Sequence, residues 1–228
     1  MSNHIQNYVH DTAQWEGKLG EMLRFETVSW LGRTFGGGKP KLKKGKENLL
    51  HLGSGHNPLE GWINADFFNY KLRFWAREYH PDWMLDLRYP LNCDDNVWDG
   101  VFTEHTLEHI HPHYALNLLK ELNRTMKPGA WLRIVVPDVE KYVNYYNGTQ
   151  NGADFGKWAN PTMALRTISQ NFFHVSLWDG KLFVEFLEEA GFINAAKVDF
   201  REGADARLLM DNPARKWESL YVEAQKPA

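Results

Sequence analysis

The stretch from Asn48 to Asp66, NLLHLGSGHNPLEGWINAD, decides how this chain is interpreted. A short apolar run, Leu49 to Leu52, reaches Gly53-Ser54-Gly55 and stops there, and a second run follows Gly61 and ends on Asp66. We interpret the stretch as a buried strand, a tight glycine turn and a second strand with a carboxylate at its tip. Glycine has no Cβ, so its backbone can adopt a positive φ and a ligand can approach it closely. An acid at the end of the next strand suits the hydroxyls of a ribose. The stretch therefore predicts half of a nucleotide-binding site.

The length and composition indicate a soluble chain of the size of one α/β domain. Its 228 residues are 43% hydrophobic and 24% charged, which is ordinary for a globular protein with a substantial core. The net charge of −3 gives no overall attraction to nucleic acid or to an anionic membrane, so neither partner is expected. The single cysteine, Cys93, excludes an internal disulfide framework and a multi-cysteine zinc site. No apolar run reaches the roughly 20 residues of a membrane span and the N-terminus lacks a signal-peptide core, so we expect a cytoplasmic protein.

Strand-like and helix-like segments alternate along the rest of the chain. Further apolar runs that read as strands lie at residues 83–85, 98–102, 131–136, 195–200 and 220–224. Pro112 is suited to the first position of a helix, because its missing N–H would be unpaired there. A later helix, residues 181–190, ends at Gly191, a residue that readily closes a helix in the left-handed conformation. This alternation predicts a mostly parallel sheet with helices on both faces.

Two segments stand apart from this alternation. Residues 1–35 carry an apolar stripe at helical spacing that a Gly-Gly-Gly-Lys-Pro run interrupts, so residues 1–40 predict a helical appendage and linker before a main domain of residues 41–228. The appendage is expected to pack against the main domain or a second subunit, and a homodimer through it is one prediction. Residues 139–178 are unusually aromatic, which favours a cap over a substrate, although the same rings could form the segment's own core.

The motifs in their order make the chain resemble the class I S-adenosylmethionine-dependent methyltransferases. The glycine turn, Asp66, Asp86-Leu87, TEHTLEHI and KPGAWLRIVVPD resemble the type 11 branch, and in particular a small bacterial subgroup with LGSG…GWINAD and EHTLEH. The resemblance implies a Rossmann-like α/β fold with a mostly parallel seven-stranded sheet, helices on both faces and an antiparallel last strand. S-adenosylmethionine would lie across the carboxyl ends of the strands, in agreement with the general rule for open α/β sheets.

The same resemblance assigns cofactor contacts to Leu52, Gly53, Ser54, Gly55, Asp66, Asp86, Leu87 and Glu104. The glycine turn would pass the methionine part of the cofactor, Asp66 would bind the ribose hydroxyls, and Asp86 with the Leu87 backbone would meet the adenine. Glu104 and His105 would border the methyl group and the acceptor. Only about ten residues separate Gly55 from Asp66, where the dinucleotide pattern has about twenty. The first crossover helix is therefore predicted to be reduced to a turn or lost.

Methyl transfer from a sulfonium mainly requires that donor and acceptor are positioned and water is excluded. A hydroxyl acceptor also needs a base, and histidine can serve near neutral pH. His105, for its position at a strand tip, and His174, for its place in the aromatic segment, are the predicted catalytic residues. We predict a methyltransferase acting on a small-molecule or glycan acceptor, at oxygen, and assign no metal ligands. The Asn/Asp-Pro-Pro-Tyr/Phe motif is lacking after the fourth strand, which argues against methylation of nucleobase amines.

Three other interpretations stay open. The segment from His105 to His109 matches H-x-x-E-H, which on a helix would place two histidines on one face as zinc ligands, with Glu108 as the base of a hydrolase. A nicotinamide-dependent reductase could use the same glycine turn, although the shortened pattern and the lack of a nearby Tyr-x-x-x-Lys pair count against it. The third is a non-catalytic cofactor-binding partner protein that docks through the N-terminal helix.

Overall fold

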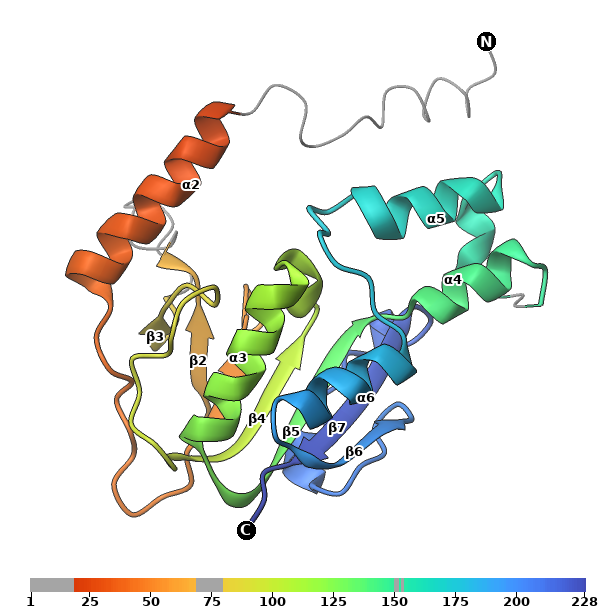
Figure 1. The fold of residues 1–228 in the computed structure, drawn as a ribbon. Helices are drawn as coiled ribbons and strands as arrows, with labels where there is room; N and C mark the ends of the chain where they lie inside the picture. Colours follow the sequence, from red (N-terminus) through yellow and green to blue (C-terminus); the bar gives the residue numbers. More distant parts are fainter. Residues whose placement is uncertain (1–18, 69–79, 150–151, 153) are drawn as a thin grey trace.

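One mixed sheet with the strand order β3-β2-β1-β4-β5-β7-β6 organises the computed structural model, which describes residues 19–68, 80–149, 152 and 154–228 (Figure 1). Its strands are β1 (Leu49–Leu52), β2 (Ile63–Asp66), β3 (Trp83–Met84), β4 (Trp98–Glu104), β5 (Met126–Pro137), β6 (Ile193–Val198) and β7 (Ser219–Gln225). β7 runs antiparallel to both of its neighbours, and the other pairs are parallel. This confirms the predicted α/β fold with seven strands and an antiparallel last strand.

The two faces of the sheet are covered differently. α3 (Pro112–Thr125) and α6 (Gly180–Glu189) lie next to each other against one face in Figure 1 and share the larger buried core with the strands. Side chains of the opposite face, such as Phe102 and Val135, form a smaller cluster with Trp62 and with Leu208 of the 3-10 helix η5 (Ala206–Leu208). Among the described residues, this smaller cluster is therefore covered by a short helical turn and adjoining chain.

Local sequence explains where the helices begin and end. Pro112 occupies the first turn of α3, as predicted, and α3 passes directly into β5 at Met126. The Asp179 side chain accepts a hydrogen bond from the Leu182 N–H at 2.8 Å and caps the start of α6. Gly191 follows α6 with a φ of +89°, the left-handed conformation that glycine adopts without strain. These signals fix the two helices that pack on the sheet.

The connection between β1 and β2 contains no helix, which confirms the prediction drawn from its length. The turn is instead fastened to the end of β2, because the N–H groups of Gly53 and Ser54 both donate to the Ala65 carbonyl, at 2.9 and 3.1 Å. Backbone hydrogen bonds therefore hold the glycine turn of the shortened crossover beside the tip of β2.

The N-terminal segment is helical in its described part, as predicted. α2 (Leu19–Leu31) continues into a π-helix, η1 (Gly32–Gly36), and stands beside the β3 edge of the sheet in Figure 1. Residues 1–18 of the predicted appendage lie outside the described residues, and so do residues 69–79 of the stretch after β2. None of the described helices combines the length and apolar character needed to cross a bilayer.

The aromatic segment builds a small core of its own above the carboxyl ends of the strands. It comprises α4 (Val139–Tyr146), η4 (Phe155–Lys157) and α5 (Pro161–Gln170), which Figure 1 shows beyond the sheet. Tyr142, Phe155 and Trp158 pack on one another and on Trp217, with ring centroids 5.1–6.1 Å apart. Most aromatic rings of this segment therefore stabilise the cap rather than face a substrate.

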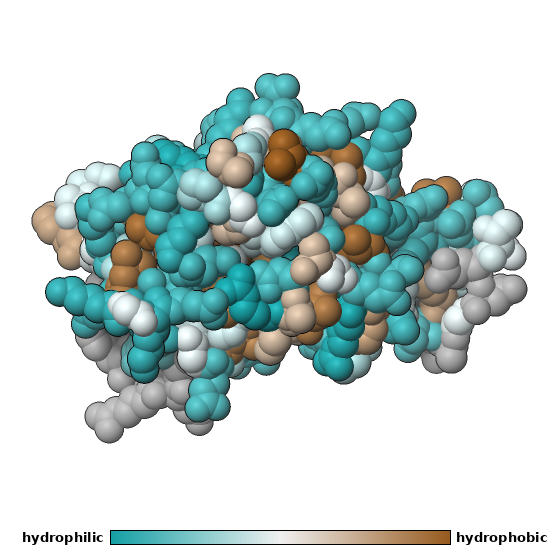
Figure 2. All heavy atoms as spheres, turned by 90° about the horizontal axis from the view of Figure 1, so that it is seen from below, coloured by the Kyte–Doolittle hydropathy of each residue, from teal (hydrophilic) through white to brown (hydrophobic). Residues whose placement is uncertain are grey.

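The end of the molecule opposite the cap has a mostly hydrophilic surface. Figure 2 views it from below, and hydrophilic residues cover most of that face, with only scattered hydrophobic ones. The sequence-predicted site residues at strand tips, such as Asp66 and Glu104, end β2 and β4 at the carboxyl edge instead.

Candidate active site

The glycine turn follows β1 directly and needs glycine for two different reasons. Gly53 has a φ of +70°, and a Cβ there would lie 2.1 Å from Oγ1 of Thr106, which packs over the turn from beyond β4. Gly55 has a φ of +52°, but a Cβ there would meet no protein atom within 4 Å among the described residues. Gly53 is thus required by packing and backbone conformation, and Gly55 borders open space. Leu52 and Ser54 are buried beside them.

Asp66 ends β2 beside this turn. The Gly55 N–H donates to Oδ2 of Asp66 at 2.5 Å, and the Phe67 N–H donates to Oδ1 at 2.6 Å. Burial raises the pKa of Asp66, although these two backbone donors and His56 oppose the effect. A carboxylate is therefore held at the tip of β2 beside an open glycine position.

The Asp86 carboxylate, which the resemblance assigns to the adenine, is hydrogen-bonded to protein groups. Its carboxylate accepts a hydrogen bond from Ser29 Oγ of α2 at 2.6 Å, and Arg88 Nε donates to Oδ1 at 3.0 Å. Burial acts to raise the pKa of Asp86, but Arg88 and Ser29 outweigh it and hold that pKa below its usual range. An adenine contact through the Asp86 carboxylate would require one of these donors to be exchanged. Leu87, the next predicted contact, packs against the main core.

α2 reinforces this corner of the sheet. Glu26 of α2 forms an ion pair with Arg88, and Phe25 stacks on Phe67 with ring centroids 4.4 Å apart and planes 11° from parallel. The helix therefore packs over the tips of β2 and β3, next to Asp66 and Asp86. The sequence carries no local signal for the roles of Ser29 and Glu26, because their partners Asp86 and Arg88 lie far away in the chain.

Glu104 and His105 end β4 in a constrained conformation. Glu104 Oε1 accepts the Asn212 N–H at 2.9 Å, and burial raises the pKa of Glu104. His105 has a φ of +50° and its N–H donates to the Val135 carbonyl at 2.8 Å. Its ring lies between two protein groups, with Nε2 3.0 Å from Ser219 Oγ and Nδ1 3.2 Å from Oε1 of Glu108.

The second predicted catalytic histidine, His174, joins the same cluster. The Val175 and Ser176 N–H groups donate to the Glu108 carbonyl at 2.8 and 3.2 Å, which fastens the end of the cap to the turn after β4. The rings of His109 and His174 are consequently 5.0 Å apart. Burial lowers the pKa of His174, so its imidazole is neutral near neutral pH. The structure thus brings both predicted catalytic histidines to Glu108.

The H-x-x-E-H segment does not form the helix that the hydrolase interpretation requires. His105 stands at the strand end with its positive φ, and only Leu107–His109 form a single 3-10 turn, η3. The two motif histidines are therefore not related by an α-helical i, i+4 spacing. Although burial acts to raise the pKa of Glu108, His105 and His109 outweigh it and hold that pKa below its usual range.

A hollow elsewhere on the surface is not the predicted cofactor site. It is lined by residues at the beginning of β2 and β3, among them Gly61, Trp62, Asn64, His80 and Asp82. The predicted cofactor residues lie instead where β1, β2 and β4 end, at Gly53, Asp66 and Glu104.

Comparison with known proteins shows a shared fold. No protein-family model matches the chain, and no curated protein matches its sequence. A SAM-dependent methyltransferase from Archaeoglobus fulgidus aligns with a TM-score of 0.50 and 18% identity, over 93% of this chain and 100% of its own. A SAM-dependent methyltransferase from Thermotoga maritima aligns with a TM-score of 0.52 and 14% identity, over 92% of this chain and 96% of its own. The fold is thus similar to that of these methyltransferases over nearly the whole chain.

Proposed function

We propose that the protein is an S-adenosylmethionine-dependent methyltransferase. The observation that carries this proposal is the position of the Gly55–Asp66 contact. β1 lies between β2 and β4, so the chain order reverses beside it, and open α/β sheets bind ligands at the carboxyl ends of strands at such a point. The glycine turn follows β1 and Asp66 ends β2, and among the described residues no atom fills the space beside Gly55. Ribose hydroxyls can donate to Asp66 there, and the methionine part can pass the turn toward Glu104.

Methyl transfer requires few chemical groups from the protein. The methyl group moves in line from the sulfonium to an acceptor oxygen, so positioning and exclusion of water supply most of the acceleration. We propose that His105 and His174 assist loss of the acceptor proton. His174 is the better placed of the two, because its Nδ1 lies 2.8 Å from the Ile168 carbonyl and donates to it, which leaves the lone pair on Nε2. Both ring nitrogens of His105 already face Ser219 and Glu108.

We propose a small-molecule or glycan acceptor that lies against the end of the cap. Phe172 and Phe173 follow α5 and are 58% and 41% exposed, whereas the cap's other large rings are mostly buried in its core. Their φ angles are +58° and +62°, and such strained backbone is found preferentially at functional sites. The Phe172 ring centroid lies 5.9 Å from that of His174. An acceptor stacked on these rings would reach the proposed base.

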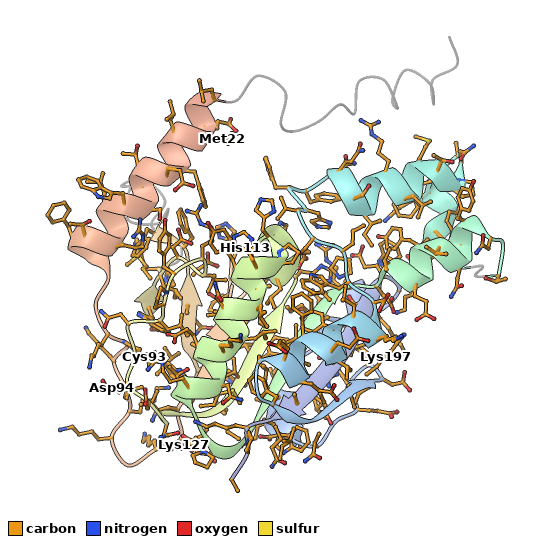
Figure 3. The ribbon with its side chains drawn as sticks, viewed as in Figure 1. Met22, Cys93, Asp94, His113, Lys127 and Lys197 are labelled. Carbon is orange, nitrogen blue, oxygen red and sulfur yellow. The ribbon has the colours of Figure 1, made fainter. Side chains whose placement is uncertain are left out.

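Calorimetric titration with S-adenosylhomocysteine, with NADH in parallel, tests the cofactor assignment. We expect micromolar binding of S-adenosylhomocysteine alone, weakened at least tenfold by Asp66→Ala. Asp94→Ala is the matched control, because Asp94 is an exposed carboxylate that Figure 3 places well away from the tips of the strands. Binding of NADH instead, or equal affinities of wild type and Asp66→Ala, would count against the proposal.

A further inference from the structure

Glu108 is a buried carboxylate that is compensated by neighbouring imidazoles rather than by hydrogen-bond donors of good geometry. Its side chain is 1% exposed, and neither oxygen accepts a hydrogen bond of acceptable geometry within the described part of the chain. An ionised carboxylate in such a place is costly unless a positive charge compensates it. The nearby groups are imidazoles, with His105 Nδ1 3.2 Å and His109 Nε2 3.8 Å from Oε1.

The ring of His105 is held by protein groups on both sides. The Ser219 hydroxyl donates to the Arg215 carbonyl at 2.8 Å, and His105 Nε2 lies 3.0 Å from Ser219 Oγ. Its Nδ1 lies 3.2 Å from Oε1 of Glu108. Both ring nitrogens of His105 are therefore engaged, and other imidazoles must supply the remaining ligands around Glu108.

His109 and His174 complete a set of ligand atoms around the carboxylate. One ligand atom each of Glu108, His109 and His174 lie within 4.8 Å of one another. Zinc bonds of about 2.0–2.1 Å in a tetrahedral site would bring such atoms to roughly 3.4 Å, so side-chain movements of about an ångström would close the set. Two imidazoles and one carboxylate are the ligands that Zn²⁺ and related divalent transition metals prefer.

Hydrogen bonds to the backbone orient His174 and fix the turn that carries Glu108. The Ile168 carbonyl accepts from Nδ1 of His174 and so presents Nε2 to the cluster, the outer contact that ligating histidines commonly make. The hydrogen bonds from the Val175 and Ser176 N–H groups to the Glu108 carbonyl fasten the chain after His174 to the turn that carries the other two ligands. The ligands therefore come from two elements that are fixed relative to each other.

We propose that Glu108, His109 and His174 form a binding site for a divalent transition metal ion. Three protein ligands leave a coordination position open. If the proposed methyltransferase function holds, that position takes an acceptor hydroxyl oxygen, whose pKa the metal lowers. The proton passes to solvent, the oxygen attacks the methyl carbon, and the S–CH₃ bond breaks as the O–CH₃ bond forms, leaving a neutral thioether. In the metal-bound protein His174 is then a ligand and not the base. The metal, rather than His174, activates the acceptor hydroxyl.

The test is calorimetric titration of the full-length, chelator-treated protein with Zn²⁺. We expect one Zn²⁺ per chain for the wild type, and affinity reduced at least tenfold in Glu108→Gln and in His174→Ala. His113→Ala is the control, because His113 is an exposed histidine at the start of α3 (Figure 3) and is not among the three proposed ligands. Its affinity should equal that of the wild type.

Two further readouts keep the outcomes distinct. The visible spectrum of bound Co²⁺ should report nitrogen and oxygen ligands in the wild type and should change in His174→Ala. Because His174 is partly exposed, this variant should still fold even if Glu108→Gln does not. No stoichiometric Zn²⁺ binding, or equal binding by wild type and His174→Ala, would overturn the metal site. S-adenosylhomocysteine affinity is measured on the same samples, so loss of cofactor binding with intact Zn²⁺ binding would refute the proposed function and leave the metal site standing.

Discussion

Gly53→Ala tests the reasoning about the glycine turn most sharply, because the structure supplies its own control. At Gly53 the φ is +70° and the new Cβ would lie 2.1 Å from Thr106 Oγ1 and 2.5 Å from Thr106 Cγ2. The left-handed conformation costs a non-glycine residue about 1–2 kcal/mol, and overpacking a filled position costs about 1–3 kcal/mol more. We therefore expect Gly53→Ala to reduce the free energy of unfolding by about 2–5 kcal/mol. A domain with about 5–15 kcal/mol of stability should survive this change.

Gly55→Ala should pay the cost of the left-handed backbone but cause no clash, because its φ is +52° and its Cβ would meet none of the described atoms within 4 Å. It should cost only about 1–2 kcal/mol. Guanidinium denaturation followed by the fluorescence of the 10 tryptophans measures both variants. Adding Thr106→Ala to Gly53→Ala should recover about 1 kcal/mol or more relative to the sum of the single changes, because the crowded atoms are gone. Equal costs for Gly53→Ala and Gly55→Ala would refute the packing argument.

Three other predictions concern stability and assembly. Asp211→Ala leaves Arg133 as a buried unpaired charge and should cost about 3–5 kcal/mol in denaturant unfolding; a cost below about 1 kcal/mol would mean the pair is dispensable. Burial raises the folded-state pKa of Asp66, so its favourable contribution to stability is greatest below the unfolded pKa and is lost as pH rises through the folded one. Asp66→Asn should remove that part of the pH dependence of the unfolding midpoint, and unchanged profiles would contradict the assignment. A homodimer through the N-terminal segment stays a prediction. α2 exposes Met22 (Figure 3) and Trp30 by 55% and 56%, and Trp30→Glu should lower the sedimentation coefficient if that face is an interface.

The strands and helices could be predicted because their signals are local. Continuous apolar runs that end at glycine or proline gave the positions of β1 and β5, and Pro112 and Gly191 marked where α3 begins and α6 ends. The missing crossover helix followed from the count of residues between the glycine turn and Asp66. Each of these inferences needs only neighbours in sequence and the periods of regular secondary structure.

The site's detailed chemistry could not be predicted because it depends on distant partners. Ser29 and Asp86 are 57 residues apart, and no local pattern indicates that α2 would occupy a carboxylate assigned to adenine. His174 meets His109 only because the chain beyond it donates backbone hydrogen bonds to Glu108. The sequence motif H-x-x-E-H did indicate metal chemistry, but for a helix that the structure replaces with a strand end and a 3-10 turn. A histidine from the cap, rather than His105, completes the proposed ligand set.

The central claim, that S-adenosylmethionine binds across the tips of β1, β2 and β4, is tested most directly by a crystal structure of the protein with S-adenosylhomocysteine. We expect the ribose hydroxyls within hydrogen-bond distance of Asp66, the amino-acid part beside Gly55, and the sulfur directed toward Glu104 and the histidine cluster. Ligand density in the hollow near Trp62 and His80, or crystals that bind no ligand at saturating concentration, would contradict the account.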